Sequence, residues 1–167
     1  MAQHQTDLHT RTVTAADGNV VITRRVHATT DAVWSVLADG WMYATWVVGA
    51  SRIRAVQPHW PQLGSRIHRF FGVWPALIDD HTEVLECDPG RELLLKARGW
   101  PAGEAHVRIQ ITTGSTPNSS IVSIAEDVTG GPGRFIPRPA RQLLITPRNT
   151  EALRRLALIA EAHTEPA

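Results

Sequence analysis

Alternating hydrophobic and polar residues dominate the middle of the chain. Within 104–113, Val107, Ile109 and Ile111 fall on one face, and polar residues occupy most of the positions between them. This pattern predicts a strand with one buried and one solvated face. Short apolar runs between turn residues predict six more strands. They span residues 18–28, 51–57, 65–72, 77–87, 92–98 and 119–128.

Helical spacing marks three segments. Residues 29–31 (Thr-Thr-Asp) supply capping oxygens and an acidic first turn for a helix that ends at Gly40. A second short helix is predicted over 41–47. The C-terminal stripe of Leu153, Leu156, Ala157 and Ala160 predicts a long amphipathic helix. Two starts are possible for this helix. Either it begins near Ala140 and contains Pro147 as a kink, or Thr146 is its N-cap and Pro147 its first residue.

The order of these elements predicts an α+β domain. Six consecutive strands form a meander, and the first strand can pair with the last to close a strongly bent antiparallel sheet of about seven strands. The C-terminal helix then lies across the concave face. Where helix and sheet diverge, a cavity can remain, and a concave apolar cavity is the default site for a small ligand.

Length and composition fit a single domain of 167 residues, in which 43% of residues are hydrophobic and 20% charged. We expect a flexible arm over 1–17, a domain over 18–163 and a tail over 164–167. The net charge of +1 argues against a nucleic-acid-binding domain. Cys87 is the only cysteine, which excludes a disulfide framework.

The chain shows neither an apolar signal segment near its N-terminus nor a run of about twenty apolar residues. We therefore expect a cytoplasmic protein without a membrane span, either a monomer or a small oligomer such as a homodimer. The eight histidines are isolated and lack a cysteine partner, so we expect no metal. The Gly130–Gly133 run is not followed by Gly-Lys-Ser/Thr, and we expect no cofactor.

Glu126 is the most informative polar residue. It shares a strand face with Val122, Ile124 and Val128. If that face is inward, a carboxylate projects into an apolar cavity, where it can act as acid, base or hydrogen-bond acceptor. The alternatives are a carboxylate that reaches solvent at the strand end or pairs with an arginine. His68 and Tyr43 are the other candidates for a catalytic base.

Several segments together resemble the helix-grip superfamily, which comprises START-domain, Bet v 1-like and polyketide cyclase/dehydrase proteins. They are residues 25–34 (Arg-Val-His-Ala-Thr-Thr-Asp-Ala-Val-Trp), 46–50 (Trp-Val-Val-Gly-Ala), 61–65 (Pro-Gln-Leu-Gly-Ser), 83–86 (Glu-Val-Leu-Glu) and 153–156 (Leu-Arg-Arg-Leu). The resemblance covers residues 18–162 and is strongest to small bacterial single-domain members. It departs at 57–64, where plant relatives carry a glycine-rich loop.

The resemblance implies a ligand cavity lined at one end by the second short helix. The residues expected to contact the ligand are Trp41, Tyr43, Trp46, Phe70, Val107, Ile109, Ile124 and Glu126. It also implies two functions, binding of a lipid-like or polycyclic hydrophobic molecule and a cyclase or dehydratase reaction with a pocket carboxylate. A third function, protein interaction, would require an exposed apolar patch.

Overall fold

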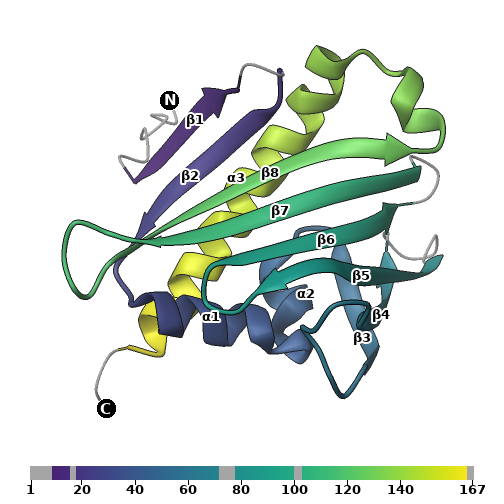
Figure 1. Ribbon diagram of the computed structural model, residues 1–167. Coiled ribbons are helices and arrows are strands. Elements are labelled where there is room, and N and C mark those ends of the chain that lie inside the picture. Colours follow the sequence, from purple (N-terminus) through teal and green to yellow (C-terminus); the bar gives the residue numbers. More distant parts are fainter. Residues whose placement is uncertain (1–8, 16–17, 72–77, 100–102, 165–167) are drawn as a thin grey trace, which may run out of the picture.

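The computed structural model describes residues 9–15, 18–71, 78–99 and 103–164. Within these residues the chain forms an antiparallel sheet with a long C-terminal helix on one face (Figure 1). The strands are β1 (Thr10–Thr14), β2 (Val20–Val26), β3 (Ala50–Val56), β4 (Arg66–Phe71), β5 (Ile78–Asp88), β6 (Glu92–Gly99), β7 (Gly103–Thr113) and β8 (Ser120–Gly130). The helices are α1 (Thr30–Ala38), the 3₁₀ helix η1 (Gly40–Met42), α2 (Tyr43–Trp46), the 3₁₀ helix η2 (Pro132–Phe135) and α3 (Arg138–Ala162).

The strand order is β1-β2-β8-β7-β6-β5-β4-β3, and every neighbouring pair is antiparallel. Strands β3 to β8 follow one another as hairpins. Strand β2 pairs with β8, with Ile22 opposite Ile124. The predicted helix-grip architecture is therefore confirmed, including the contact between the first strand of the expected domain and the last.

Curvature of the sheet has local causes in the pairing. The register shifts between Val84 and Glu86 on β5, and again between Glu104 and Ala105 on β7. Such irregularities bend a strand and increase its twist. Helix α3 runs along the concave side, and α1 and α2 lie against its C-terminal half (Figure 1). This arrangement leaves the opposite end of the sheet, near η2, without a covering from α1 and α2.

Strand β1 differs from the expectation for the N-terminal segment. We expected a flexible arm over 1–17, but Thr10–Thr14 pairs with β2 along its full length. The segment has few large apolar groups, and four of the five β1 side chains are exposed. Its threonines and Val13 are nevertheless β-branched and suit an extended edge strand. The sheet thus has one strand more than predicted, and residues 1–8 lie outside the described residues.

The helix termini settle the alternatives that the sequence left open. Thr29 caps α1, as predicted, because its side-chain oxygen accepts a hydrogen bond from the N–H of Ala32 at 3.2 Å. Helix α3 begins at Arg138, close to the earlier of the two predicted starts, and continues through Pro147. A proline inside a helix costs about 3 kcal/mol because it removes a backbone donor and crowds the preceding turn.

The hydrophobic core lies between the C-terminal half of α3, α1 and the sheet. Its helix side is the predicted stripe, in which Leu153, Leu156, Ala157 and Ala160 are all buried. The opposing strand residues include Ile22, Ile109 and Val122. Among the described helices, none has the length and hydropathy needed to cross a bilayer.

Candidate functional site

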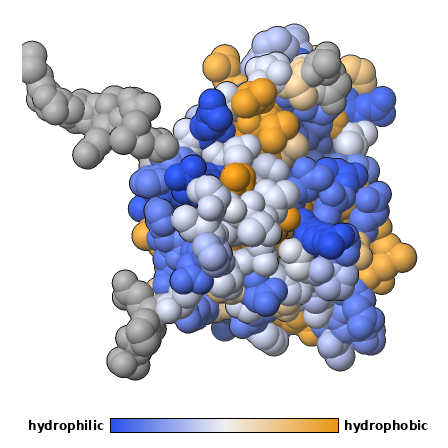
Figure 2. Space-filling model, turned by 60° about the vertical axis from the view of Figure 1, so that its left-hand side comes forward, coloured by the Kyte–Doolittle hydropathy of each residue, from blue (hydrophilic) through white to orange (hydrophobic). Residues whose placement is uncertain are grey.

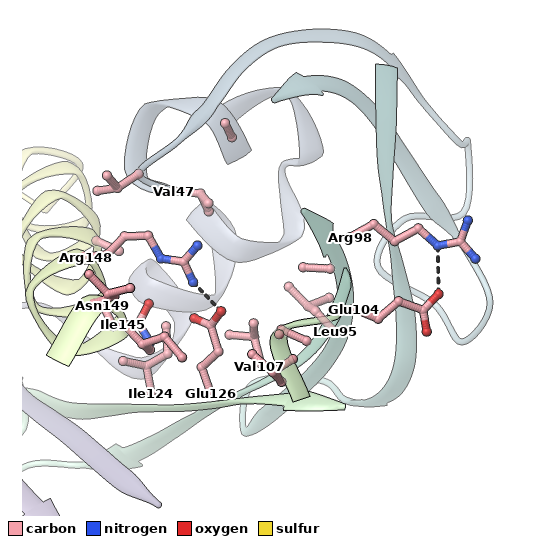
Figure 3. Close-up of a pocket in the computed structure, with 18 of the residues that line it drawn as sticks. Val47, Leu95, Arg98, Glu104, Val107, Ile124, Glu126, Ile145, Arg148 and Asn149 are labelled. Atoms are coloured by element: carbon pink, nitrogen blue, oxygen red, sulfur yellow. Dashed lines mark hydrogen bonds and ion pairs between the residues drawn. The ribbon is translucent and has the colours of Figure 1, made fainter. Parts of the chain in front are cut away.

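A cavity of about 320 Å³ lies between the sheet and the N-terminal half of α3. This volume is at the lower end of the range for small-molecule sites. Apolar side chains from α3, from the region of α2 and from several strands form most of its wall. They include Val47, Leu95, Val107, Ile124 and Ile145 (Figure 3).

Glu126 brings a carboxylate into this apolar wall. It lies on β8 opposite Val107 of β7, and it follows the inward positions Val122 and Ile124. Only 5% of Glu126 is exposed. The sequence left the orientation of Glu126 open, and the structure places its side chain on the inner face of β8.

The carboxylate of Glu126 is paired through one oxygen. Nη2 of Arg148, which comes from α3, donates a hydrogen bond to Oε1 of Glu126 and forms an ion pair with it (Figure 3). The other oxygen, Oε2, is buried and has no hydrogen-bond partner among the described residues. The site therefore contains a hydrogen-bond acceptor that is available to a ligand.

Two neighbouring side chains of α3 fix the backbone around Glu126. Nε2 of Gln142 donates to the carbonyl oxygen of Glu126 at 3.1 Å, and Nη1 of Arg141 donates to the carbonyl oxygen of Val128 at 3.0 Å. Arg141 also pairs with Asp127 at 3.1 Å. These contacts bind β8 to α3 at Glu126 and at the two residues after it, so the position of the carboxylate is held by the fold as well as by the ion pair.

A second polar group of side chains lies on the α2 side of the cavity. The hydroxyl of Tyr43 and Oγ1 of Thr82 are 3.3 Å apart and share a hydrogen bond. Nε of Arg69 donates to the same Oγ1 at 3.2 Å, and the Arg69 guanidinium lies 6.0 Å from the centre of the Tyr43 ring. Arg69 is only 3% exposed, so a buried cation also contributes to the cavity wall.

The mouth of the cavity is recognisable from side chains that line it and are also exposed. Leu144 is 75% exposed and Ile136 is 43% exposed. Phe135 and Leu143, next to them in sequence, are exposed as well. Figure 2 shows hydrophobic groups among polar ones near the upper end of the molecule, where η2 and the start of α3 lie. The cavity therefore opens near η2.

Five of the residues predicted to contact a ligand line this cavity. They are Tyr43, Trp46, Val107, Ile124 and Glu126. Tyr43 and Trp46 pack edge to face, with ring centres 5.3 Å apart. The structure thus brings together residues from α2, β7 and β8, and their contact with a ligand remains a prediction.

Trp41 does not line the cavity, and its predicted placement is corrected. It is 59% exposed and borders a separate surface depression with Trp60. The reason lies in its neighbour Gly40, whose backbone packs directly against Val56. A Cβ added to Gly40 would lie 2.6 Å from the Val56 side chain. Gly40 therefore occupies the inner side of the turn, and Trp41 faces outward.

His68 and Phe70 also point away from the cavity, contrary to prediction. On β4 the inward positions are Ile67 and Arg69. Side chains alternate along a strand, so His68 and Phe70 lie on the outer face. The ring of His68 lies 6.1 Å from that of His81, and the guanidinium of Arg54 lies 5.5 Å from the ring centre of Phe70. This placement removes His68 as a base for chemistry in the cavity.

Ile109 requires a smaller correction. It is on the inner face of β7, as predicted, but it is 1% exposed and belongs to the packed core rather than to the cavity wall. Val107, two residues earlier on the same face, does line the cavity. The cavity thus begins between these two positions of one strand.

The polar cavity residues that were not predicted from the sequence are Arg69, Arg98, Glu104, Arg141, Arg148 and Asn149. Arg69 can be buried because Oγ1 of Thr82 and the carbonyl oxygen of Arg98 accept its hydrogen bonds. Asn149 lies four residues before Leu153, so extending the helix stripe backward would have found it. Within the described residues, no cluster of three or more His, Cys, Asp or Glu side chains could hold a metal ion.

Comparisons with known proteins identify the fold. No family model and no curated protein matches the chain. Among solved structures, a Rhodobacter sphaeroides protein has a TM-score of 0.68 at 18% identity, covering 92% of this chain and 99% of that one. A Staphylococcus aureus protein of unknown function has a TM-score of 0.67 at 8% identity, covering 96% and 100%.

CalU16 from Micromonospora echinospora is a third similar structure. It has a TM-score of 0.57 at 16% identity, with 94% of this chain and 87% of that chain covered. These identities are low, so the three structures show that the chain shares their fold, a sheet with a C-terminal helix, and no more.

Proposed function

We propose that this protein binds a small hydrophobic molecule, lipid-like or polycyclic, in the cavity between the sheet and α3. The observation that carries the proposal is the cavity itself, which has a volume of about 320 Å³ and a mostly apolar wall. The shared fold and the motifs quoted above support the further proposal that the chain is a member of the helix-grip superfamily. In this proposal the exposed apolar residues around Leu144 form the entrance for the ligand.

The size of the cavity limits what hydrophobic burial can contribute. It can hold about ten groups of the size of water or methylene. Burial of ten methylenes contributes about 8 kcal/mol, and association costs several kcal/mol. At most about 4 kcal/mol then remains, which corresponds to millimolar affinity, so micromolar binding requires the polar groups of the wall.

The proposal predicts that filling the cavity prevents binding. Val107→Phe adds a ring at a lining position of β7. We expect it to weaken binding of the neutral fluorescent probe N-phenyl-1-naphthylamine by about tenfold or more, because the two rings compete for one volume. Fluorescence titration measures the affinity.

Thr112→Phe is the matched control, since Thr112 is on the same strand but exposed on the opposite face. It should bind the probe as the wild type does, and thermal unfolding should show that both variants are folded. Absence of binding to the wild type, or equal binding by Val107→Phe, would contradict the proposal.

A second function is a cyclase or dehydratase reaction, and Oε2 of Glu126 is the observation that favours it. A buried carboxylate oxygen without a partner can take a proton from a carbon that lies between two carbonyl groups. Arg148 beside it would stabilise the enolate that forms, because the guanidinium is positive.

The Glu126→Gln variant separates the two functions. If a poly-β-ketone analogue is turned over by the wild type, and Glu126→Gln abolishes turnover while the analogue still binds, the protein is an enzyme. If the wild type binds the analogue without turnover, the binding function stands.

A further inference from the structure

We infer that the ligand is an uncharged hydrophobic molecule with a hydroxyl group, and that this hydroxyl donates a hydrogen bond to Oε2 of Glu126. The inference rests on the proposed binding function and names the class of molecule that the cavity takes. It begins from Glu126, which is 5% exposed and whose Oε2 accepts no hydrogen bond from the described residues.

A buried ionised acceptor without a donor is costly. The desolvation of one such group costs about 1–3 kcal/mol, and more for a charged group. Arg148 donates a hydrogen bond to Oε1 of Glu126, so only Oε2 of this carboxylate is left without a donor among the described residues. The backbone of Glu126 is held by Gln142 at 3.1 Å, so the side chain stays in the wall of the cavity. A donor on the ligand would complete the hydrogen bonding of the carboxylate.

The charges around the cavity favour a neutral donor. Arg148 is adjacent to Oε1, and Arg69 is buried in the same wall, so a cationic ligand would be repelled. The Glu126 carboxylate would equally repel an anionic group placed at Oε2. On the rim, Arg98 and Glu104 pair with each other at 2.9 Å. A neutral hydrogen-bond donor is repelled neither by the two arginines nor by the carboxylate.

A hydroxyl group on the ligand fits this site better than a group that only donates hydrogen bonds, because the hydroxyl oxygen can also accept one. Asn149 is 4% exposed and lines the cavity on the α3 side, beside Arg148 and across from Glu126 (Figure 3). Its amide supplies donors, and the oxygen of a hydroxyl can accept while its proton goes to Glu126. The rest of the ligand then lies against Leu95, Val107 and Ile124, which bear no polar group.

Three naphthalenes of similar shape test the inference. They are 2-naphthol, 2-methoxynaphthalene, which lacks the donor, and 2-naphthoate, which is anionic at pH 7. Equilibrium dialysis against the full chain gives the three affinities. We expect 2-naphthol to bind about tenfold to hundredfold more tightly than either of the others, because a hydrogen bond to a charged acceptor is lost in both.

The Glu126→Gln variant should lose most of the preference for 2-naphthol over 2-methoxynaphthalene while still binding the latter. Glu92→Gln is the matched control. Glu92 is also an ion-paired strand carboxylate, held by Arg108, but it does not line the cavity. It should keep the full preference.

The outcomes separate the two proposals. If 2-methoxynaphthalene or 2-naphthoate binds as tightly as 2-naphthol, the inference is wrong and the cavity still binds hydrophobic molecules. If none of the three binds, the proposed function fails and the inference fails with it.

A measurement on the wild type covers the case in which Glu126→Gln does not fold. With ¹³C-carboxyl-labelled glutamate, 2-naphthol should shift the resonance of one buried carboxylate and 2-methoxynaphthalene should not. The same shift with both compounds, or with neither, would overturn the inference.

Discussion

At the scale of single residues, Glu126 shows what alternation along a strand can and cannot predict. Alternation with Val122, Ile124 and Val128 made an inward position one of the alternatives, and the structure shows Glu126 inward. It also shows the pairing with an arginine that was another alternative, but strand periodicity could not identify Arg148, because this residue lies on α3. The burial of Arg69 could not be predicted for a related reason, since it depends on the acceptors Thr82 and Arg98 on other strands.

The ion pair predicts an asymmetric response to mutation. Arg148→Met should lower the free energy of unfolding by about 2–3 kcal/mol, because it leaves a buried carboxylate without its cation. This is less than the loss of about 3–5 kcal/mol expected for a fully buried pair, because Arg148 is partly exposed. The double variant Glu126→Leu with Arg148→Met should recover to within about 1 kcal/mol of the wild type, because it removes both charges.

Urea unfolding of the wild type, both single variants and the double variant measures the coupling. If Arg148→Met and the double variant were equally unstable, packing by the arginine stem rather than charge would explain the loss.

At the scale of elements, the strands after residue 50 were predicted to within about two residues, because Gly, Pro and Asn clusters bound each of them. Two elements escaped this reasoning. Strand β1 has no buried face to create alternation, and the start of α3 was ambiguous because Pro147 suits either a first turn or a strained interior.

Helix α3 also predicts a pH dependence of stability. Hydrogen bonds from Arg154 and Arg155 lower the pKa of Glu151 from 4.5 to about 2. Because the pKa is lower in the folded state, the stabilisation is present above about pH 4.5 and is lost as the pH falls toward 2. Glu151 is a third exposed, so screening by solvent limits the contribution to at most about 1 kcal/mol.

Glu151→Gln should therefore unfold at a slightly lower temperature than the wild type at pH 7, and the difference should shrink as the pH falls through this range. Thermal unfolding of both proteins measures it. High salt at pH 7 should also reduce the difference, and a difference that grew toward low pH would contradict the assignment.

At the scale of the whole molecule, the topology followed from element order, while the size of the cavity did not. A meander with a terminal amphipathic helix restricts the fold to a bent sheet with the helix inside. The volume depends instead on small residues such as Ala97, Gly103 and Ala105, which line the end not covered by α1. A pattern of polar and apolar positions does not distinguish residues that line a cavity from residues in the packed core. Val107 and Ile109 lie on the same face of β7, yet Val107 lines the cavity and Ile109 belongs to the core.

The proline inside α3 has a consequence for the rate of ligand exchange in the proposed binding function. Pro147 has no N–H, so the carbonyl of Leu143 loses the donor that a regular helix would supply. Leu143 and Leu144 are mostly exposed, so these two side chains bury little apolar surface in this turn. Fraying there costs less free energy than global denaturation. Under the proposed binding function, a ligand can thus exchange through local opening of this end of α3, while the sheet stays folded.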